Sequence, residues 1–380
     1  MWSGILLDKY ISMLMNILVG SVGTIAWLIF IPIATQEMEE STGWYACNGG
    51  IIVMGLFGSM IQNGIFALVG TFPSRYVSGT MIGIGTSGII FLVFRTILIL
   101  FLRPDNTKGR NDMNSYYGTL IFFGASAVIL VICIIAAVYV FNTTFAKFYL
   151  EKAQEGSHSS FITDNKTDDT GYSFISTSDL DKGEHINKSV LSKSQNGRSP
   201  KIDRKSNTLL NAYKELGSIP YQMSLSLVIT FCMYPGCIYE THLKFLSGNK
   251  SEDTWFAIII GLVYGTNDIL GRYLAEKFKI FNSKTIGFVT FSRLIFMPLF
   301  IMIPVLESPS WLLGADYFKL IALSLFAVTG GYNWTALMVL GPEMVRTSLK
   351  DKAGMIMNCH LVGGIFLGSL IAAVGIARIF

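Results

Sequence analysis

The sequence predicts an all-α fold, a bundle of about nine helices that cross a membrane. Of the 380 residues, 51% are hydrophobic and only 14% are charged, whereas soluble domains carry about 25% charged residues. Apolar runs recur at the length of about 20 residues that a helix needs to cross ~30 Å of hydrocarbon. No run alternates in polarity as a barrel strand does, and in lipid only helices and closed barrels satisfy their backbone polar groups. Together these observations predict a polytopic, all-helical membrane protein.

The expected spans follow one another along the chain. The first run is too long for the core of a signal peptide and lacks a clear cleavage site before the acidic stretch QEMEE, so we count it as a span. With ends placed to within several residues, we expect spans over residues 11–34, 45–70, 77–102, 117–141, 219–239, 254–271, 285–305, 317–341 and 353–377.

A polar segment divides these spans into two groups. Between residues 143 and 217 the chain is rich in Ser, Asp, Asn, Lys and Thr, and such a segment cannot bury enough apolar surface to offset its chain entropy. We therefore expect an N-terminal half of four spans over residues 1–142, a disordered loop over 143–217 and a C-terminal half of five spans over 218–380.

The distribution of basic residues predicts the orientation. Most lysines and arginines of the loops fall on one face, which includes both ends of the long loop, although Arg103, Lys108 and Arg110 fall on the other. The positive-inside rule places the long loop in the cytoplasm. We expect an integral, multi-pass protein of the plasma membrane rather than of an internal membrane.

Two charges stand inside an apolar run. Asp268 and Arg272 are four residues apart in VYGTNDILGRYLAEK, so a helix places them on one face, within contact distance. Ionisable residues in a span usually face the bundle interior and mark a substrate or ion route. The alternative is an ion pair that only locks helix packing. The residues alone favour neither interpretation.

Other spans carry polar residues and prolines with candidate roles. Gln62 has a carboxamide that can meet the adjacent donors and acceptors of a nucleobase, although an interhelical hydrogen bond is the commoner use. Arg293 lies well inside its span and needs an acidic or carbonyl partner. Pro235 removes a helix hydrogen bond and predicts a kink. Arg95 is nearer a span end and is assigned a structural role, and His360 is expected to be a packed, hydrogen-bonded residue.

Several function classes are excluded or disfavoured. The five cysteines show neither CxxC pairs nor histidines at metal-ligand spacing, so we expect no disulfide and no metal site. The net charge of +4 is spread over the loops, which argues against nucleic acid as a partner. The motifs of hydrolases, nucleotide-binding loops and dinucleotide folds are missing, so we expect neither an enzyme nor a cofactor. A substrate-translocating bundle remains, with the lipid bilayer around it.

Separated motifs in this chain resemble those of the equilibrative nucleoside transporters, a solute carrier family, and they come in the family's order. IQNGIFALVGTFPSRYVSGTMIGIGTSGI resembles the family's fourth and fifth helices, MYPGC the seventh, NDILGR the eighth and RLIFMPLF the ninth. GGYNWTALMVLGPEMV and AGMIMNCHLVGGIFLGSLIAA resemble the tenth and eleventh. The resemblance covers nearly the whole chain outside the central loop. It implies a major-facilitator-like bundle in which the spans here are the third to eleventh, so that the family's first two helices are lacking.

The resemblance also implies roles for residues. Gln62 matches the family's nucleobase-contacting glutamine, and Asp268 and Arg272 match an aspartate and an arginine near the ribose. We expect a structural or gating role for four other residues: Arg293, Pro235, Gly83 and Gly85. Between the last two, Ile84 stands where the family usually has a polar residue, which leaves the substrate preference open.

The function predicted is membrane transport of nucleosides, with nucleobases as a further candidate substrate, by alternating access around a site near the midplane. The alternative is a transport-inactive, truncated relative that acts as a binding or scaffold protein. Coupling to protons is left open by the sequence.

Overall fold

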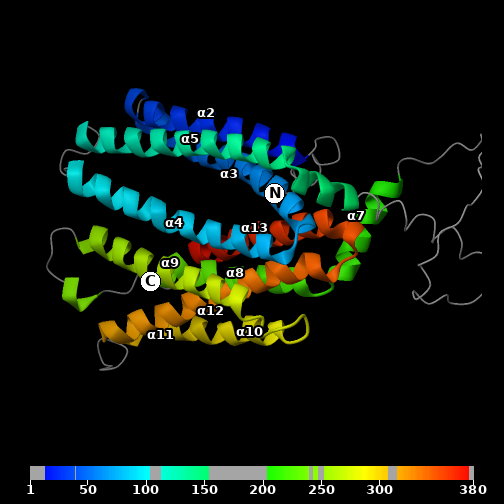
Figure 1. Cartoon of the computed structure of the whole chain (residues 1–380). Helices are drawn as coiled ribbons and strands as arrows, with labels where there is room; N and C mark the ends of the chain where they lie inside the picture. The colour runs from blue at the N-terminus through cyan, green and yellow to red at the C-terminus, as the bar shows by residue number, and fades with distance from the viewer. Residues whose placement is uncertain are drawn as a thin grey trace, which may run out of the picture.

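A computed structural model describes residues 13–38, 40–102, 113–153, 203–238, 243–246, 252–306 and 315–375. Within these ranges the chain is almost entirely helical and has no strand (Figure 1). The predicted all-α class is therefore confirmed.

The first group of helices consists of four long elements. They are α2 (Met13–Glu37), α3 (Glu40–Thr71), α4 (Ser74–Leu102) and α5 (Met113–Asn142). Helix α2 packs against both α3 and α5, and α4 contacts α5. In Figure 1, α2, α3 and α5 lie together on one side, and α4 lies between them and the second group.

The second group contains the better buried helices. They are α8 (Ile219–Cys232), α9 (Glu252–Lys277), α10 (Ile286–Ser292), α11 (Phe296–Leu306), α12 (Asp316–Met344) and α13 (Lys350–Val374). Helix α12 packs along α9 and α8, and α13 packs along α8. The two groups meet where α3 packs against α13 and where α4 packs against α9 and α12. Residues of α4 thus lie directly beside the charged stretch of α9.

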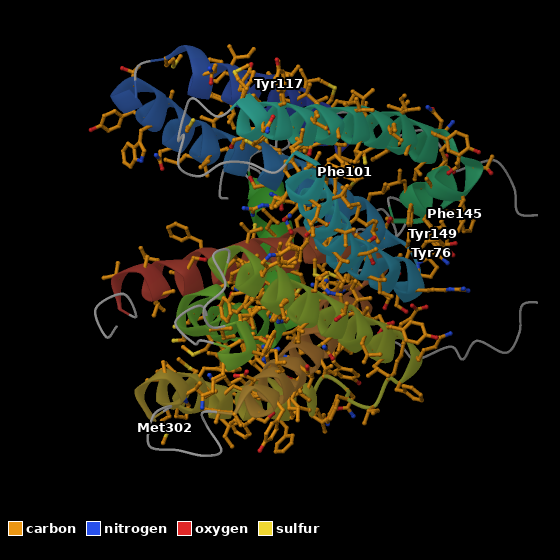
Figure 2. The ribbon with its side chains drawn as sticks, turned by 90° about the vertical axis from the view of Figure 1, so that its left-hand side faces the viewer. Tyr76, Phe101, Tyr117, Phe145, Tyr149 and Met302 are labelled. Atoms are coloured by element: carbon orange, nitrogen blue, oxygen red, sulfur yellow. The ribbon has the colours of Figure 1, made fainter. Side chains whose placement is uncertain are left out.

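The outer surface of the bundle is apolar. Helix α5 has no buried residue although it is composed largely of Ile, Val, Ala and Phe. Phe101 is 83% exposed, and Figure 2 shows it on the outside of the helices together with Tyr117 and Met302. A soluble protein would not leave so much apolar surface in contact with water. Lipid accounts for this surface, and the chain is an integral membrane protein.

Seven helices in the described ranges are long and apolar enough to cross a membrane. Two further predicted spans fall on other elements. The one over 219–239 covers α8 and a π-helical turn, Met233–Cys237, and the one over 254–271 lies within α9, whose 26 residues include charges. The total of about nine therefore stays a prediction.

Two prolines explain the breaks in the second group. Tyr234 has extended backbone angles, φ −118° and ψ 124°, because the residue before a proline is pushed out of the α region. The break predicted at Pro235 is therefore present. A 3₁₀ turn over Arg293–Ile295 separates α10 from α11, since the ring of Pro298 clashes with the carbonyl of the residue four positions before it. Arg293 begins this turn.

Both ends of the range expected to be a disordered loop are helical. Residues 144–153 form a helix that packs Phe145 and Tyr149 against Phe72 at the end of α3. Figure 2 shows these two side chains beside Tyr76 of α4. Helix α7 (Asp203–Leu216) precedes α8 and buries Ala212 and Leu216 completely. The middle of the expected loop, residues 154–202, lies outside the described residues.

Candidate functional site

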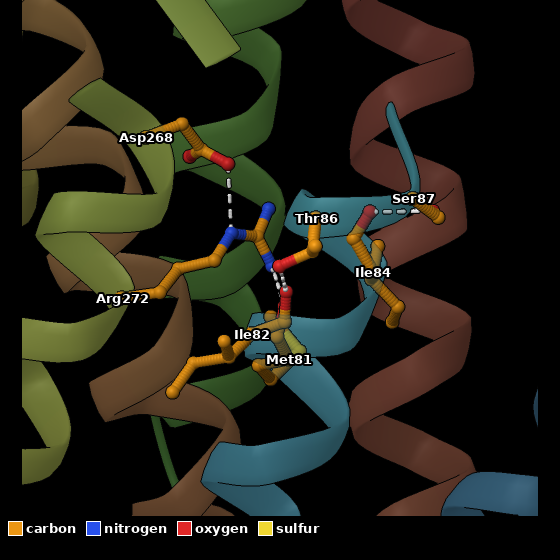
Figure 3. A network of polar contacts seen from close by, with 7 residues as sticks. All are labelled: Met81, Ile82, Ile84, Thr86, Ser87, Asp268 and Arg272. Carbon is orange, nitrogen blue, oxygen red and sulfur yellow. Dashed lines mark hydrogen bonds and ion pairs between the residues drawn. The ribbon is translucent and has the colours of Figure 1, made fainter. Parts of the chain in front are cut away.

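Asp268 and Arg272 form a buried ion pair on α9. The Nε of Arg272 donates to Oδ2 of Asp268 over 2.7 Å, and each residue is only 4% exposed. The second carboxylate oxygen, Oδ1, has no partner. Figure 3 shows the guanidinium reaching from α9 towards α4. The predicted contact between the two side chains is thus present, and one carboxylate oxygen is left without a hydrogen-bond partner.

Helix α4 supplies the second anchor of Arg272. The Nη1 of Arg272 donates to the backbone carbonyl of Met81 on α4 over 2.7 Å. A Cβ added at Gly85 would lie 2.9 Å from the Nε of Arg272, whereas a Cβ at Gly83 would meet nothing within 4 Å. Of the two predicted glycines, only Gly85 is needed for this approach. Ile84 is 40% exposed and points away from Arg272 (Figure 3).

Trp334 of α12 lies between two arginines. The Cζ of Arg272 is 5.2 Å from the centroid of the indole ring, and the Cζ of Arg293 is 5.9 Å from it. Both distances are within the range of cation–π attraction. The indole Nε1 donates to the hydroxyl of Ser226 over 3.1 Å, which fixes the ring. Trp334 therefore brings the two arginines to one place in the core.

Arg293 is completely buried, with 0% exposure. Its Nη2 donates to the hydroxyl of Thr230 over 2.8 Å, and its Cζ lies 4.8 Å from the ring centroid of Phe326. Its Nε and Nη1 have no partner. The acidic or carbonyl partner expected from the sequence is thus not hydrogen-bonded to Arg293 in this conformation, in which a threonine hydroxyl takes its place.

Gln62 comes from the other junction between the two groups. It is partly buried in α3, and its Oε1 has no partner. The next residue, Asn63, accepts a hydrogen bond from Asn358 of α13 over 2.6 Å. A Cβ on Gly354 would lie 2.1 Å from the carbonyl oxygen of Phe66, so α3 and α13 are in backbone contact close by. In the described part of the chain, Gln62 has no hydrogen bond to either residue of the ion pair on α9.

Several buried polar atoms of the described residues have no hydrogen-bond partner, and those beside the ion pair make this region the candidate site. Among the described residues they include Gln62 Oε1, Tyr264 OH, Asp268 Oδ1, Arg293 Nε and Nη1, and Thr335 Oγ1. Leaving such atoms unpaired costs about 1–3 kcal/mol each, and more for charged groups. The set contains donors as well as acceptors, so it suits a polar ligand that carries both.

Helix α7 is held to the second group by side chains that lie apart from this set. The Tyr213 hydroxyl contacts Nε2 of His360, and the Ser224 hydroxyl lies 2.8 Å from Nδ1 of the same ring. Burial, followed by the neighbouring Tyr221, raises the pKa of Tyr213 to about 12, so its hydroxyl stays protonated at neutral pH. His360 is thus a packed, hydrogen-bonded residue, as expected.

The sequence alone did not single out Trp334 or Tyr264. Trp334 stands within the quoted stretch GGYNWTALMVLGPEMV, but only the packing of α12 brings it to the arginines. Tyr264 has a detectable signal, because it lies one turn before Asp268 on the same helix face. Its ring stacks on Tyr234, with centroids 4.1 Å apart.

Comparison with known proteins decides the family. Residues 49–376 match the family described as nucleoside transporter. The chain belongs to the nucleoside transporter family. Equilibrative nucleoside transporter 4 of Danio rerio is 26% identical over 96% of this chain and 71% of its own length. Equilibrative nucleotide transporter 3 of Arabidopsis thaliana is 24% identical over 90% and 73%, respectively.

A human relative, equilibrative nucleoside transporter 1, is 22% identical over 84% of this chain and 66% of its own length. The resemblance found in the sequence is therefore confirmed. A member of the nucleoside transporter family is a membrane transporter and not an enzyme.

Proposed function

We propose that this protein carries nucleosides across the membrane by alternating access, with the two helix groups moving around the polar atoms between α4, α9 and α12. The observation that carries the proposal is the buried Asp268–Arg272 pair, which lies at the contact between the groups and leaves Oδ1 open. The family match favours transport over an inactive scaffold or binding protein.

The ion pair suits the sugar of a nucleoside. Vicinal hydroxyls can donate to the carboxylate of Asp268 and accept from the guanidinium of Arg272. Because Met81 and Trp334 hold the guanidinium, it is oriented before a ligand arrives. A planar guanidinium offers donors in a fixed geometry that an ammonium group lacks.

Gln62 suits the nucleobase. Its carboxamide can accept and donate at once, as the edge of a purine or pyrimidine requires. The free Oε1 supports this role. Gln62 lies where α3 packs against α13, and the ion pair lies where α4 packs against α9. One ligand could therefore contact both only in certain relative positions of the two helix groups.

We assign a structural or gating role to Pro235, at the break after α8, and to Gly85 on α4, whereas Gly83, where an added Cβ would meet nothing within 4 Å, has no contact that calls for one. The close contact of α3 with α13 at Gly354 would be broken and reformed in each transport cycle. We place residues 1–142 and 218–380 in the two moving halves. The segment between them faces the cytoplasm, and the plasma membrane is the expected location.

Uptake into liposomes that contain the purified chain tests the proposal. Labelled adenosine, uridine and hypoxanthine are offered with and without a pH gradient. We expect saturable uptake of a nucleoside that runs to equal concentrations without the gradient. The hypoxanthine arm decides whether free nucleobases are also carried, and the gradient arm decides whether protons are coupled. No saturable uptake of any of the three would contradict the proposal and support the scaffold alternative.

A further inference from the structure

We propose that Arg293 binds the substrate directly, as a hydrogen-bond donor to the sugar, and so makes the site specific for nucleosides over free nucleobases. This inference rests on the proposed function and assigns Arg293 a role beyond structure or gating. It extends the sugar site from the Asp268–Arg272 pair across α12 to the 3₁₀ turn that begins at Arg293.

The charge of Arg293 is not matched by a hydrogen-bonded carboxylate. Four residues that carry a charge at neutral pH are buried among those described: one carboxylate, Asp268, and three bases, Arg272, Arg293 and Lys319. The carboxylate is already bonded to Arg272. An arginine that is 0% exposed within a membrane span is costly, and such residues mark substrate routes. Contacts with Thr230 and two aromatic rings satisfy only part of the guanidinium.

The unpartnered atoms of Arg293 and Asp268 both lie against α12. A Cβ on Gly330 would lie 2.5 Å from Nη1 of Arg293, and a Cβ on Gly331 would lie 2.9 Å from Oδ1 of Asp268. The free donor therefore lies against Gly330 and the free acceptor against the next residue of α12, Gly331. Neither of these glycines has a side chain that would fill the space beside the two atoms.

The unpartnered groups in this region include both hydrogen-bond donors and acceptors. Asp268 Oδ1 can only accept a hydrogen bond while it is ionised, and Arg293 Nε and Nη1 can only donate. The unpartnered hydroxyl of Tyr264 can do either. A hydroxyl-bearing sugar matches this set, since each hydroxyl donates one hydrogen bond and accepts others. A free nucleobase has no sugar, so it would leave these protein groups without hydrogen-bond partners. A site built to hydrogen-bond a substrate hydroxyl strongly rejects a ligand that lacks it.

The test combines substrate analogues with variants of the full chain in liposomes. Uptake of adenosine, its 2′-deoxy, 3′-deoxy and 5′-deoxy analogues and adenine is measured for the wild type, for Arg293→Gln and for Arg293→Lys. Arg95→Gln is the matched control, because Arg95 is exposed on α4. Detergent melting of the wild type with adenosine or adenine is measured alongside and needs no variant.

We expect Arg293→Gln to weaken adenosine uptake roughly tenfold, as the loss of one charge-assisted hydrogen bond would. The analogue that lacks the contacted hydroxyl should lose much less, and Arg95→Gln should change nothing. Adenosine, but not adenine, should raise the melting temperature of the wild type.

Two outcomes overturn the inference alone: an equal loss for all substrates in Arg293→Gln, which indicates a scaffold role, or equal stabilisation of the wild type by adenine and adenosine. If neither ligand is transported or stabilises the wild type, the proposed function fails as well, so the two failures can be told apart.

Discussion

Asp268 accepts a hydrogen bond from Arg272 through one carboxylate oxygen, over 2.7 Å, and keeps its other oxygen without a partner. The pair is thus neither a fully satisfied lock between helices nor a free charge. The pair lies between α4 and α12, so a larger residue on either helix would displace it. Glycines of α4, α9 and α12 provide matched tests of this packing.

Gly85→Ala should reduce uptake strongly, whereas Gly83→Ala should not. A Cβ at Gly85 would lie 2.9 Å from the Nε of Arg272, whereas a Cβ at Gly83 would meet nothing within 4 Å. The Arg272 side chain cannot easily move aside, because it donates hydrogen bonds to Asp268 and to Met81. Both substitutions add one methyl group to the same helix. Uptake and surface expression of the two variants decide the point, and equal uptake by both would show that Arg272 tolerates displacement.

Gly331→Ala and Gly271→Ala should lower the thermal stability of the protein in detergent. Added Cβ atoms would lie 2.1 Å from the carbonyl oxygens of Asp268 and Val328, respectively, so α9 and α12 would have to move apart. Overpacking of this kind costs about 1–3 kcal/mol. Gly79→Ala is the control, because its Cβ meets nothing within 4 Å. Unchanged melting in both test variants would contradict the close packing of α9 on α12.

Tyr213→Phe should make the free energy of unfolding fall less steeply as the pH rises from about 10 to 12. An unfolded tyrosine ionises near pH 10, whereas the pKa of Tyr213 in the folded protein is about 12. The folded state therefore holds more protons between these values, so stability is fully present below pH 10 and falls as the pH rises to 12. Melting curves of the wild type and the variant across this window check the prediction. Parallel curves would show that the hydroxyl is not buried against His360.

Tags inserted between residues 154 and 202 should be reachable only from the cytosol, and tags near Lys250 only from outside. The basic residues of the loops predict this orientation. Labelling of intact and permeabilised cells distinguishes the two sides. If both tags are labelled from the same side, the number of spans between them is wrong.

Hydropathy predicts the membrane class well, because every span in lipid must be apolar outside and must satisfy its backbone hydrogen bonds within the segment. The four-residue spacing of Asp268 and Arg272 likewise predicts their contact. The contacts of Arg272 with Met81 and Trp334 could not be predicted, since they depend on how α4 and α12 pack against α9. Ile84, where the family usually has a polar residue, is 40% exposed and lies on the side of α4 away from Arg272 (Figure 3).

For helix α7 the sequence did contain a helical pattern, but the polar composition of the segment was given more weight. Leu209, Ala212 and Leu216 have the spacing of an amphipathic helix, but the polar composition around them predicted disorder. Packing against the start of α13 decides the structure locally. Glu215 adds to it by accepting two hydrogen bonds from Arg346, one from the backbone and one from the side chain.

The central claim is that Asp268 and Arg272 bind substrate, and the most direct measurement compares Asp268→Asn, Arg272→Lys and a double variant with both charges removed. Surface expression, detergent melting and nucleoside uptake are measured on all three. Our account predicts that each single variant is folded and inserted, yet loses about tenfold to a hundredfold in apparent affinity, as expected for one charge-assisted hydrogen bond. The contradicting result is a loss of stability together with uptake in each single variant and recovery of both in the neutral double variant, which would make the pair a structural lock.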